Sequence, residues 1–355
     1  MNAVTRELIV LVPGSARLAR GSQRDRLVKG MVTTIERVKV DRVETSDVPA
    51  GVTRLHASSG PVTRAIDIVE AYWNDLVPSP EAAGVRARFV RGSSLVVYWG
   101  FSGVWRGFQN RKYLTLGLIG GGLSLLTWYY GTVVMFVQAL LSDQTAGPVV
   151  SSVLSPVMPV VTAIGTWKVW ALATLVMGLL PVNVLVGVMD LTKRYLTNER
   201  PAGEGTGLRN EIRRRVKEQI DAALAAGPYD RLTVVGHSFG AVVAADVLAD
   251  LPVKAPHLRV VTLGSPIELL ARRERWLADE VRKCLERPDL AMWVDICAAD
   301  DWFASGSDLP DGGRTRVVEL PLRGSVVDRL SGRTHRGYFD VDEVVNVLVD
   351  APSAH

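Results

Sequence analysis

The chain has 355 residues, of which 41 are basic and 37 acidic, giving a formal net charge of +4. That length leaves room for one large domain or two ordinary ones, and the small, dispersed charge excludes a strong electrostatic case for nucleic-acid binding. Only two cysteines are present, which excludes the disulfide framework of a secreted scaffold and favours a reducing compartment.

The N-terminal segment predicts a first strand and no export signal. Residues 1–15, MNAVTRELIVLVPGS, contain an apolar run of strand length preceded by Glu7. They lack the basic start and the long apolar stretch of a signal peptide. A basic, helix-like segment follows at 19–38, and possible strands follow at 52–58 and 66–73.

The middle of the chain is the source of a mean hydropathy of +0.17, which is high for a soluble protein. No residue between Lys112 and Asp143 is charged, and roughly 20 apolar residues are enough to span a bilayer. We predict a transmembrane helical insert over residues 112–191, with two spans at about 114–140 and 169–189. The stretch 144–167 contains three prolines and suits a re-entrant or interfacial piece better, so two or three crossings remain open.

This insert interrupts one soluble domain made of residues 1–111 and 192–355. If both parts build one domain, they lie on the same side of the membrane, which requires an even number of crossings. Basic residues concentrate at the outer ends of the insert, namely Arg106, Arg111, Lys112, Lys193, Arg194 and Arg200. The positive-inside rule then predicts an integral protein of the cell membrane with its soluble domain on the cytoplasmic side. The alternatives are a buried helical hairpin and an apolar cap that lies on the membrane without crossing it.

Beyond the insert, strands alternate with helices. A charged amphipathic helix is predicted at 207–227 and a last helix at 340–350. Apolar, strand-like runs lie at 231–236, 258–265, 291–298 and 315–322. Alternation of this kind predicts an α/β fold whose sheet is mostly parallel, with helices on both faces.

One strand runs into a serine between two glycines, VVGHSFGA, with a small-residue helix behind it. A serine on a sharp strand-to-helix turn requires small neighbours two residues away on either side, and Gly236 and Gly240 satisfy this requirement. The turn would expose Ser238 as a nucleophile and leave the Phe239 N–H at a helix N-terminus, where it can donate to an oxyanion. The bland alternative is a glycine-bounded turn without chemistry.

With these residues the chain resembles the α/β-hydrolase superfamily, in particular its lipase- and esterase-like serine hydrolases. The resemblance covers the first strand and about 208–349, and the apolar insert has no counterpart in the common soluble members. It implies a catalytic triad in the chain order Ser, acid, His. Of the five histidines, His335 in SGRTHRGYFD is the one that this order and its place between the last strand and the last helix favour as the base. The other histidines are His56, His237, His257 and His355.

The resemblance also implies an acid after the strand at 291–298. Laying WVDICAADDWF along the family pattern favours Asp301, and Asp300 is the alternative acid. Asp295 lies inside the strand and is expected to be structural.

A second oxyanion donor is expected in the loop after the first strand. Gly14 and Ser15 are the residues we name there, although Pro13 stands where family members often have histidine. The segment LGSPI at 263–267 is another frequent family feature near the serine, and we expect a structural role for it.

No other chemistry is indicated by the sequence. Neither cysteine is spaced as a metal ligand, and no phosphate-binding glycine motif is present, so we expect no metal and no cofactor. We predict a membrane-anchored carboxylesterase- or lipase-like enzyme that cleaves an ester or thioester of a lipid-like acyl substrate through an acyl-enzyme on Ser238. The alternative is a catalytically silent membrane scaffold or receptor module with the same fold. Expected partners are the acyl substrate and the membrane, with no nucleic acid, and the oligomeric state stays open.

Overall fold

The computed structural model describes residues 5–16, 18–33, 39–43, 51–59, 62–77, 84–102, 112–142, 167–200, 205–252, 257–310, 312–321, 325, 328–329 and 332–349. They belong to two compact units. The first combines Met1–Val77 with Tyr195–His355, and the second is Pro78–Arg194.

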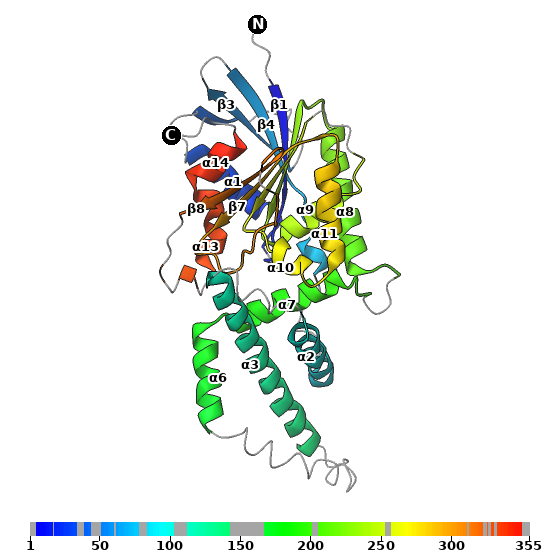
Figure 1. The fold of residues 1–355 in the computed structure, drawn as a ribbon, viewed down its shortest axis with the longest axis vertical. Helices are drawn as coiled ribbons and strands as arrows, with labels where there is room; N and C mark the ends of the chain where they lie inside the picture. The colour runs from blue at the N-terminus through cyan, green and yellow to red at the C-terminus, as the bar shows by residue number, and fades with distance from the viewer. Residues whose placement is uncertain are drawn as a thin grey trace. The chain divides into compact units, whose positions relative to one another are not determined.

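A single eight-stranded sheet forms the centre of the first unit (Figure 1). Its strands are β1 (Thr5–Val12), β2 (Lys39–Val43), β3 (Thr53–Ser59), β4 (Val62–Glu70), β5 (Arg231–His237), β6 (Leu258–Leu263), β7 (Leu290–Ala298) and β8 (Thr315–Leu320). Their spatial order is β2-β3-β4-β1-β5-β6-β7-β8. The pairs from β4 to β8 are parallel, and only β2 with β3 and β3 with β4 are antiparallel. The prediction of a mostly parallel α/β sheet is confirmed, and the antiparallel edge is an addition to it.

Helices cover both faces of this sheet. Figure 1 shows α1 (Ser22–Thr33) and α14 (Asp342–Leu348) on one face, and α8 (Leu208–Ala225), α9 (Phe239–Leu248) and α11 (Arg275–Glu286) on the other. Shorter pieces complete the unit: η1 (Asn74–Leu76), α10 (Ile267–Ala271), α13 (Arg333–Arg336) and η4 (Gly337–Asp340). The charged helix α8 buries four apolar residues spaced by four, which is the single stripe that holds a surface helix on a sheet.

The strand order reverses at β1, because β1 lies between β4 on one side and β5 on the other. Chain segments that leave β1 and β5 therefore run to opposite faces of the sheet, α1 to one and α9 to the other. Such a reversal opens a crevice at the carboxyl ends of the two strands, which is where ligands bind in open α/β sheets. Pro13 follows β1 and Ser238 follows β5, so both loops of interest meet at this crevice.

The second unit is helical and apolar. It contains α2 (Val85–Gly100), α3 (Lys112–Ser142), α6 (Trp167–Leu179) and most of α7 (Val182–Leu196). Within α3, Gly117–Val137 is long and apolar enough to cross a membrane. Of the most apolar 18 consecutive residues of this segment, 28% are buried within the protein. That fraction is low for a helix in the core of a soluble protein.

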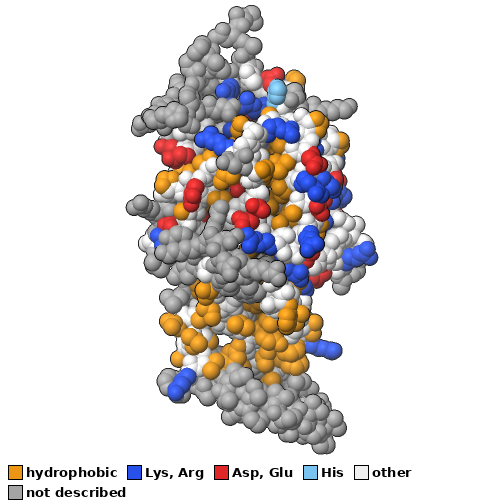
Figure 2. All heavy atoms as spheres, in the orientation of Figure 1, with side chains coloured by type: hydrophobic (Ala, Val, Ile, Leu, Met, Phe, Trp, Pro, Cys, Tyr) orange, Lys and Arg blue, Asp and Glu red, His pale blue; other side chains and the backbone are white. Residues whose placement is uncertain are grey.

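Figure 2 shows hydrophobic side chains crowded on the visible face of the helical unit, whereas charged side chains are spread over the α/β unit. The exposed large apolar residues of the helical unit include Ile119, Leu123, Leu126, Met135, Leu172, Leu175, Met177 and Val184. An exposed apolar surface of this kind is stable in contact with lipid and costly in contact with water.

The second apolar stretch is not one straight helix. It is divided next to Pro181, and Ala171–Gly178 and Val182–Leu196 are bent by 78° relative to each other. Proline explains the break, because its ring removes the backbone donor and clashes with the preceding turn. The stretch 144–166, together with Arg106 and Arg111, lies outside the described residues, so the number of crossings and the domain boundaries at 111 and 192 stay predictions.

Candidate active site

Ser238 occupies a strained turn between β5 and α9. Its φ of 55° and ψ of −127° lie in a region that non-glycine residues rarely adopt, and such a conformation costs on the order of 1–3 kcal/mol. The backbone is fixed on both sides, because the Ser238 N–H donates to Leu263 O at 2.8 Å and Ser238 O accepts from the Ala241 N–H at 3.0 Å. The surrounding fold therefore holds the side chain away from both the strand and the helix.

The two flanking glycines are required by space. A Cβ at Gly236 would lie 2.6 Å from Ala241 Cα, and a Cβ at Gly240 would lie 2.2 Å from Val12 O. Both distances are shorter than any side-chain carbon tolerates. Gly240 thus lets α9 approach the end of β1, and Gly236 lets it fold back over β5.

The loop after β1 lies against the nucleophile. A Cβ at Gly14 would be 3.1 Å from Ser238 Cβ and 3.2 Å from His237 O. Phe239 is the first residue of α9, so its N–H belongs to the first turn, where amide groups have no acceptor within the helix. The structure brings Phe239 and the loop of Gly14 and Ser15 to Ser238, as an oxyanion-binding site requires.

His335 connects the serine to an aspartate. Its Nε2 lies 2.7 Å from Ser238 Oγ, and its Nδ1 lies 2.7 Å from Asp301 Oδ2. His335 comes from the short helix α13 between β8 and α14, and Asp301 follows the end of β7. Three residues separated by as much as 97 positions thus form one continuous hydrogen-bonded chain, with the nucleophile–base–acid geometry of a serine triad.

Asp301 has the surroundings of a buried anion held in place. Its side chain has no exposed surface, and Oδ1 accepts from the Phe303 N–H at 3.0 Å. Tyr338 donates its hydroxyl to Oδ2 at 2.8 Å and accepts from the Ala298 N–H at 2.9 Å. Burial, and next to it the charge of Asp301, raise the pKa of Tyr338 well above its usual value, so the phenol remains a donor to the carboxylate.

The two other aspartates are turned to different partners. Asp300, the alternative acid, pairs with Arg329 at 2.6 Å. Asp295 accepts from the Thr262 hydroxyl at 2.6 Å and from the Ser307 N–H at 2.8 Å, inside the sheet. Asp301 Oδ2 lies 2.7 Å from the His335 ring, so the geometry favours Asp301 over Asp300 as the acid.

His237 lies beside the nucleophile without facing it. Its Nε2 lies 3.1 Å from the backbone oxygen of His335, and its Nδ1 lies 3.2 Å from Gln23 Oε1. Burial, followed by the nearby His335, lowers the pKa of His237 to about 3, so the ring is neutral at pH 7. The imidazole is therefore placed to hold the backbone of the catalytic-base candidate rather than to titrate.

Two of the remaining histidines, His56 on β3 and His257 before β6, are exposed, and the third, His355, lies outside the described residues. Within the described part of the chain, no group of three His, Cys, Asp or Glu side chains is arranged to hold a metal ion.

Four residues of the site were not named individually in the sequence analysis. Gly264 has a φ of +59°, and a Cβ there would be 2.7 Å from the Tyr338 ring and 3.2 Å from His335 Cε1. Asn74 donates to Gly14 O at 2.7 Å and to Ala16 O at 2.8 Å, which fixes the loop after β1. Gln23 accepts from the Gly14 N–H at 3.4 Å, and Tyr338 positions the acid. Only Gly264 left a signal, since it belongs to the LGSPI segment.

Comparison of the chain with protein-family models found a match, which includes the serine turn. The family described as lipase (class 3) matches residues 166–289, roughly a third of the chain. The matched region includes β5, the serine turn, α9 and β6. The chain belongs to the α/β-hydrolase superfamily. Searches of curated proteins and of solved structures found no match.

The match to the lipase (class 3) family indicates that this α/β-hydrolase is a serine hydrolase of the general type that cleaves esters. It ends before Asp301 and His335, so the assignment of these two residues depends on the hydrogen-bonded chain to Ser238 and on their position in the fold. It begins within the helical unit, at the start of α6.

Proposed function

We propose that the chain is a membrane-anchored serine hydrolase that cleaves an ester or thioester of a lipid-like acyl compound through an acyl-enzyme on Ser238. The observation that carries the proposal is the connection of Ser238 Oγ, His335 and Asp301 by two contacts of 2.7 Å. A module without catalysis has no physical need for a strained serine, an imidazole within hydrogen-bond distance of it and a buried carboxylate in one line.

In the first half of the reaction, Ser238 Oγ attacks the carbonyl carbon of the acyl group while His335 Nε2 takes the hydroxyl proton. Asp301 accepts the hydrogen bond from Nδ1–H and stabilises the imidazolium that forms. The carbonyl π electrons move to oxygen, and the oxyanion is bound by N–H groups from Phe239 and from the loop of Gly14 and Ser15. Collapse of this intermediate expels the alcohol or thiol, which receives the proton from His335.

In the second half, water attacks the acyl-enzyme. His335 Nε2 takes a proton from the water, and the second tetrahedral intermediate releases the carboxylic acid and restores the Ser238 hydroxyl. No redox partner and no metal enters either half of this sequence, because every proton is moved by His335 and every transient charge faces the imidazolium or an N–H donor.

The lipid-like substrate class is supported by the helical unit. The apolar segment Gly117–Val137 would place the hydrolase at a membrane surface, where acyl compounds are concentrated. The basic flanks of the apolar segments favour the cytoplasmic side of the cell membrane. A return crossing by the bent pair α6–α7 would keep both parts of the α/β unit on that side.

A fluorophosphonate probe tests the catalytic proposal on the full chain in detergent or nanodiscs. We expect covalent labelling of the wild type, loss of labelling in Ser238→Ala, and a strongly slowed reaction in His335→Ala. If the chain is a catalytically silent scaffold, the wild type is not labelled. A melting temperature equal to that of the variants would show that this lack of labelling is not due to unfolding. Labelling that persists in Ser238→Ala would contradict the assignment of the nucleophile.

Cysteine accessibility tests the topology. Cys284 and Cys297 are buried, and burial raises the pKa of Cys284 to about 12, so both react slowly with a charged maleimide. A cysteine introduced at Ala146, between the two apolar segments, is expected to react from outside intact cells. Reaction only after the cells are opened would defeat the two-crossing proposal without touching the catalytic one.

A further inference from the structure

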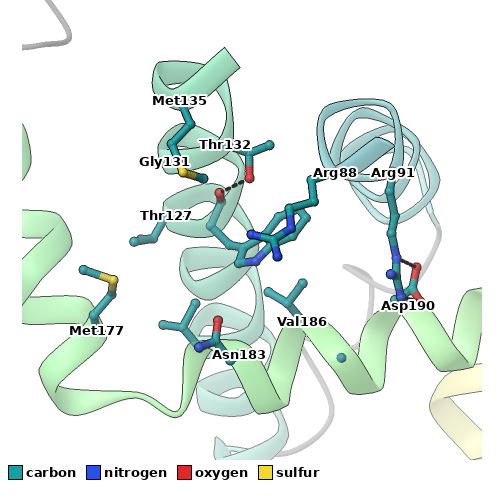
Figure 3. A pocket seen from close by; sticks show the side chains of 13 residues that line it. Arg88, Arg91, Thr127, Gly131, Thr132, Met135, Met177, Asn183, Val186 and Asp190 are labelled. Atoms are coloured by element: carbon teal, nitrogen blue, oxygen red, sulfur yellow. Dashed lines mark hydrogen bonds and ion pairs between the residues drawn. The ribbon is translucent and has the colours of Figure 1, made fainter. Parts of the chain in front are cut away.

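A separate cavity of about 380 Å³ lies within the helical unit, and residues from α2, α3, α6 and α7 line it (Figure 3). All of its lining residues fall between Arg88 and Asp190 in the chain, so they are distinct from Ser238, Asp301 and His335. The proposed hydrolysis therefore does not account for this cavity.

The charged residues at the cavity are already engaged inside the protein. Arg91 Nε donates to Asp190 Oδ1 at 2.6 Å, and a second contact joins Arg91 Nη2 to Asp190 Oδ2. Figure 3 shows the Arg91 side chain turned to Asp190. Arg88, the third charged residue of the lining, is not free either. An uncharged ligand therefore suits this cavity better than an ion.

Asn183 is a polar residue of the lining whose carboxamide has no hydrogen-bond partner among the described residues. Figure 3 shows its side chain on the same side of α7 as Val186. The surrounding stretch 169–189 otherwise consists of apolar residues, glycine, Pro181 and Thr174. A carboxamide without a partner is unfavourable in lipid, and polar residues in membrane segments commonly mark a functional site. This step depends on the membrane placement that belongs to the proposed function.

The rest of the lining is suited to hydrocarbon. Trp128 and Met135 come from α3, Met177 from α6 and Val186 from α7. Methionine side chains are flexible and polarizable, so they adapt to alkyl chains of different shape. Met135 is 43% exposed and Met177 53% exposed, so the cavity borders the exposed apolar surface of the helical unit. An alkyl chain from surrounding lipid would meet apolar side chains both at the edge of the cavity and inside it.

The size of the cavity limits the ligand. A volume of about 380 Å³ lies near the lower end of the range for small-molecule sites, which is roughly 300–1,000 Å³. It accommodates a small head group with part of one alkyl chain, and the two chains of a phospholipid would not fit side by side.

We propose that this cavity binds a single-chain amphiphile with an uncharged, hydrogen-bonding head, such as a monoacylglycerol, with the head at the Asn183 carboxamide and the alkyl chain along Met135 and Met177. The carboxamide donates to an ester or hydroxyl oxygen and accepts from a hydroxyl group. Thr127 adds a hydroxyl group to the lining. Uncharged acyl esters are also the substrate class of the proposed hydrolysis, and that link depends on the proposed function, whereas binding does not require Ser238.

The experiment uses the full chain carrying Ser238→Ala in phosphatidylcholine nanodiscs, with a monoacylglycerol whose alkyl chain carries a diazirine as the probe. Crosslinked peptides are mapped by mass spectrometry. Competition is measured with monooleoylglycerol, with 1-octadecene, which has no head group, and with lysophosphatidic acid, which has a charged one. We expect crosslinks in 127–135 and 182–190 that monooleoylglycerol removes at a lower concentration than either of the other two competitors.

A first pair of variants tests the head group. Asn183→Leu is expected to weaken competition by monooleoylglycerol about three- to tenfold, because one or more hydrogen bonds to the head are lost, and to leave competition by 1-octadecene unchanged. Thr174→Leu is the matched control, because Thr174 is an exposed polar residue of the same apolar stretch and is not part of the lining.

A second pair of variants tests the space. A Cβ at Gly131 meets no atom within 4 Å, so Gly131→Leu is expected to occupy the cavity and to abolish the crosslinks. Gly178→Leu is the control, because Gly178 is equally unobstructed and is not part of the lining. Melting temperatures equal to those of the parent protein show that the variants are folded.

Equal competition by 1-octadecene or lysophosphatidic acid, unchanged competition in Asn183→Leu, or crosslinks that survive Gly131→Leu would overturn the proposal. These outcomes leave the hydrolase assignment untouched, because the protein tested has no nucleophile. Fluorophosphonate labelling tests catalysis and the cysteine at Ala146 tests the membrane placement, so failure of the binding proposal and failure of the proposed function are observed separately.

Discussion

Replacement of Asp301 by asparagine is the substitution whose effect follows most directly from the structure. Asp301 Oδ2 accepts from two donors, His335 Nδ1 and the Tyr338 hydroxyl, and Oδ1 accepts from the Phe303 N–H. In Asp301→Asn the amide has one oxygen. If this oxygen stays with Phe303, the amide NH₂ group faces two former donors, and His335 must move its proton from Nδ1 to Nε2.

With that proton on Nε2, His335 donates to Ser238 Oγ and cannot accept its proton. Loss of the correct tautomer and of the anion beside the imidazolium is expected to lower kcat by about 1,000- to 10,000-fold. At 1.36 kcal/mol per factor of ten, this corresponds to about 4–5.5 kcal/mol of lost transition-state stabilisation. The KM for a short-chain p-nitrophenyl ester is expected to change little, because the acid does not contact the substrate.

Asp300→Asn is the matched control. It changes the neighbouring residue in the same way, and it removes an ion pair with Arg329 rather than a contact to the base. Initial rates of both variants with the same ester give the comparison, and we expect Asp300→Asn to keep more than a third of the wild-type kcat. Retention of a tenth or more of the activity by Asp301→Asn, or equal losses in the two variants, would refute the reasoning.

Four further predictions concern the surroundings of the site. Gly264→Ala is expected to lose about 1–2 kcal/mol of stability from its left-handed conformation alone, and its Cβ would also push on the base and on the tyrosine that holds the acid; melting temperature and kcat should both fall. Asn74→Ala frees two carbonyl groups of the loop after β1 and is expected to lower kcat about ten- to hundredfold at nearly constant KM, which steady-state kinetics checks. Because the pKa of His237 is lowered from 6.5 to about 3, the unfolded chain binds a proton between these pH values that the folded chain does not. The free energy of unfolding should therefore fall as pH falls, by about 1.4 kcal/mol per pH unit from this group. Urea titrations at several pH values should show that the free energy of unfolding of His237→Gln depends on pH less steeply than that of the wild type, by the same amount. Asp246→Ala removes a fully buried carboxylate that two arginines and a tyrosine hydroxyl share and is expected to destabilise by about 3–5 kcal/mol, against less than about 1 kcal/mol for the exposed Asp250→Ala.

Local patterns explain why much of the fold was predictable. The strands that form the parallel part of the sheet are short apolar runs, and their alternation with helices leaves few topologies open. Gly236, Ser238 and Gly240 are determined by the sterics of one tight turn, which acts within a few residues. At the antiparallel edge, β3 overlaps the strand predicted at 52–58, whereas β2 was not predicted, because three of its five residues, KVDRV, are charged.

The site was predictable only as far as chain order could act as a filter. Order leaves one suitable histidine, but it does not separate Asp300 from Asp301, and only the resemblance to the family pattern favoured Asp301. The turn after β7 separates them by pointing one side chain to His335 and the other to Arg329. Asn74 and Tyr338 could not be found in this way, because their roles arise from contacts across 58–60 and 37 residues of sequence.

Aromatic residues next to both chain junctions of the helical unit contact the same residue of the site, Phe239. Before the first junction at Val77, the Trp73 ring packs on Phe239 with 6.0 Å between ring centroids, and the next residue, Asn74, holds the loop after β1. After the second junction, the Tyr195 ring meets Phe239 edge-on at 5.2 Å, while its hydroxyl donates to the buried Asp246 at 2.7 Å. Phe239 supplies the N–H that follows the nucleophile, so rings at both ends of the insert determine where an oxyanion donor lies. We expect an excision that rejoins the chain between Val77 and Tyr195 to preserve the position of the Phe239 N–H only if both rings stay packed on the Phe239 ring.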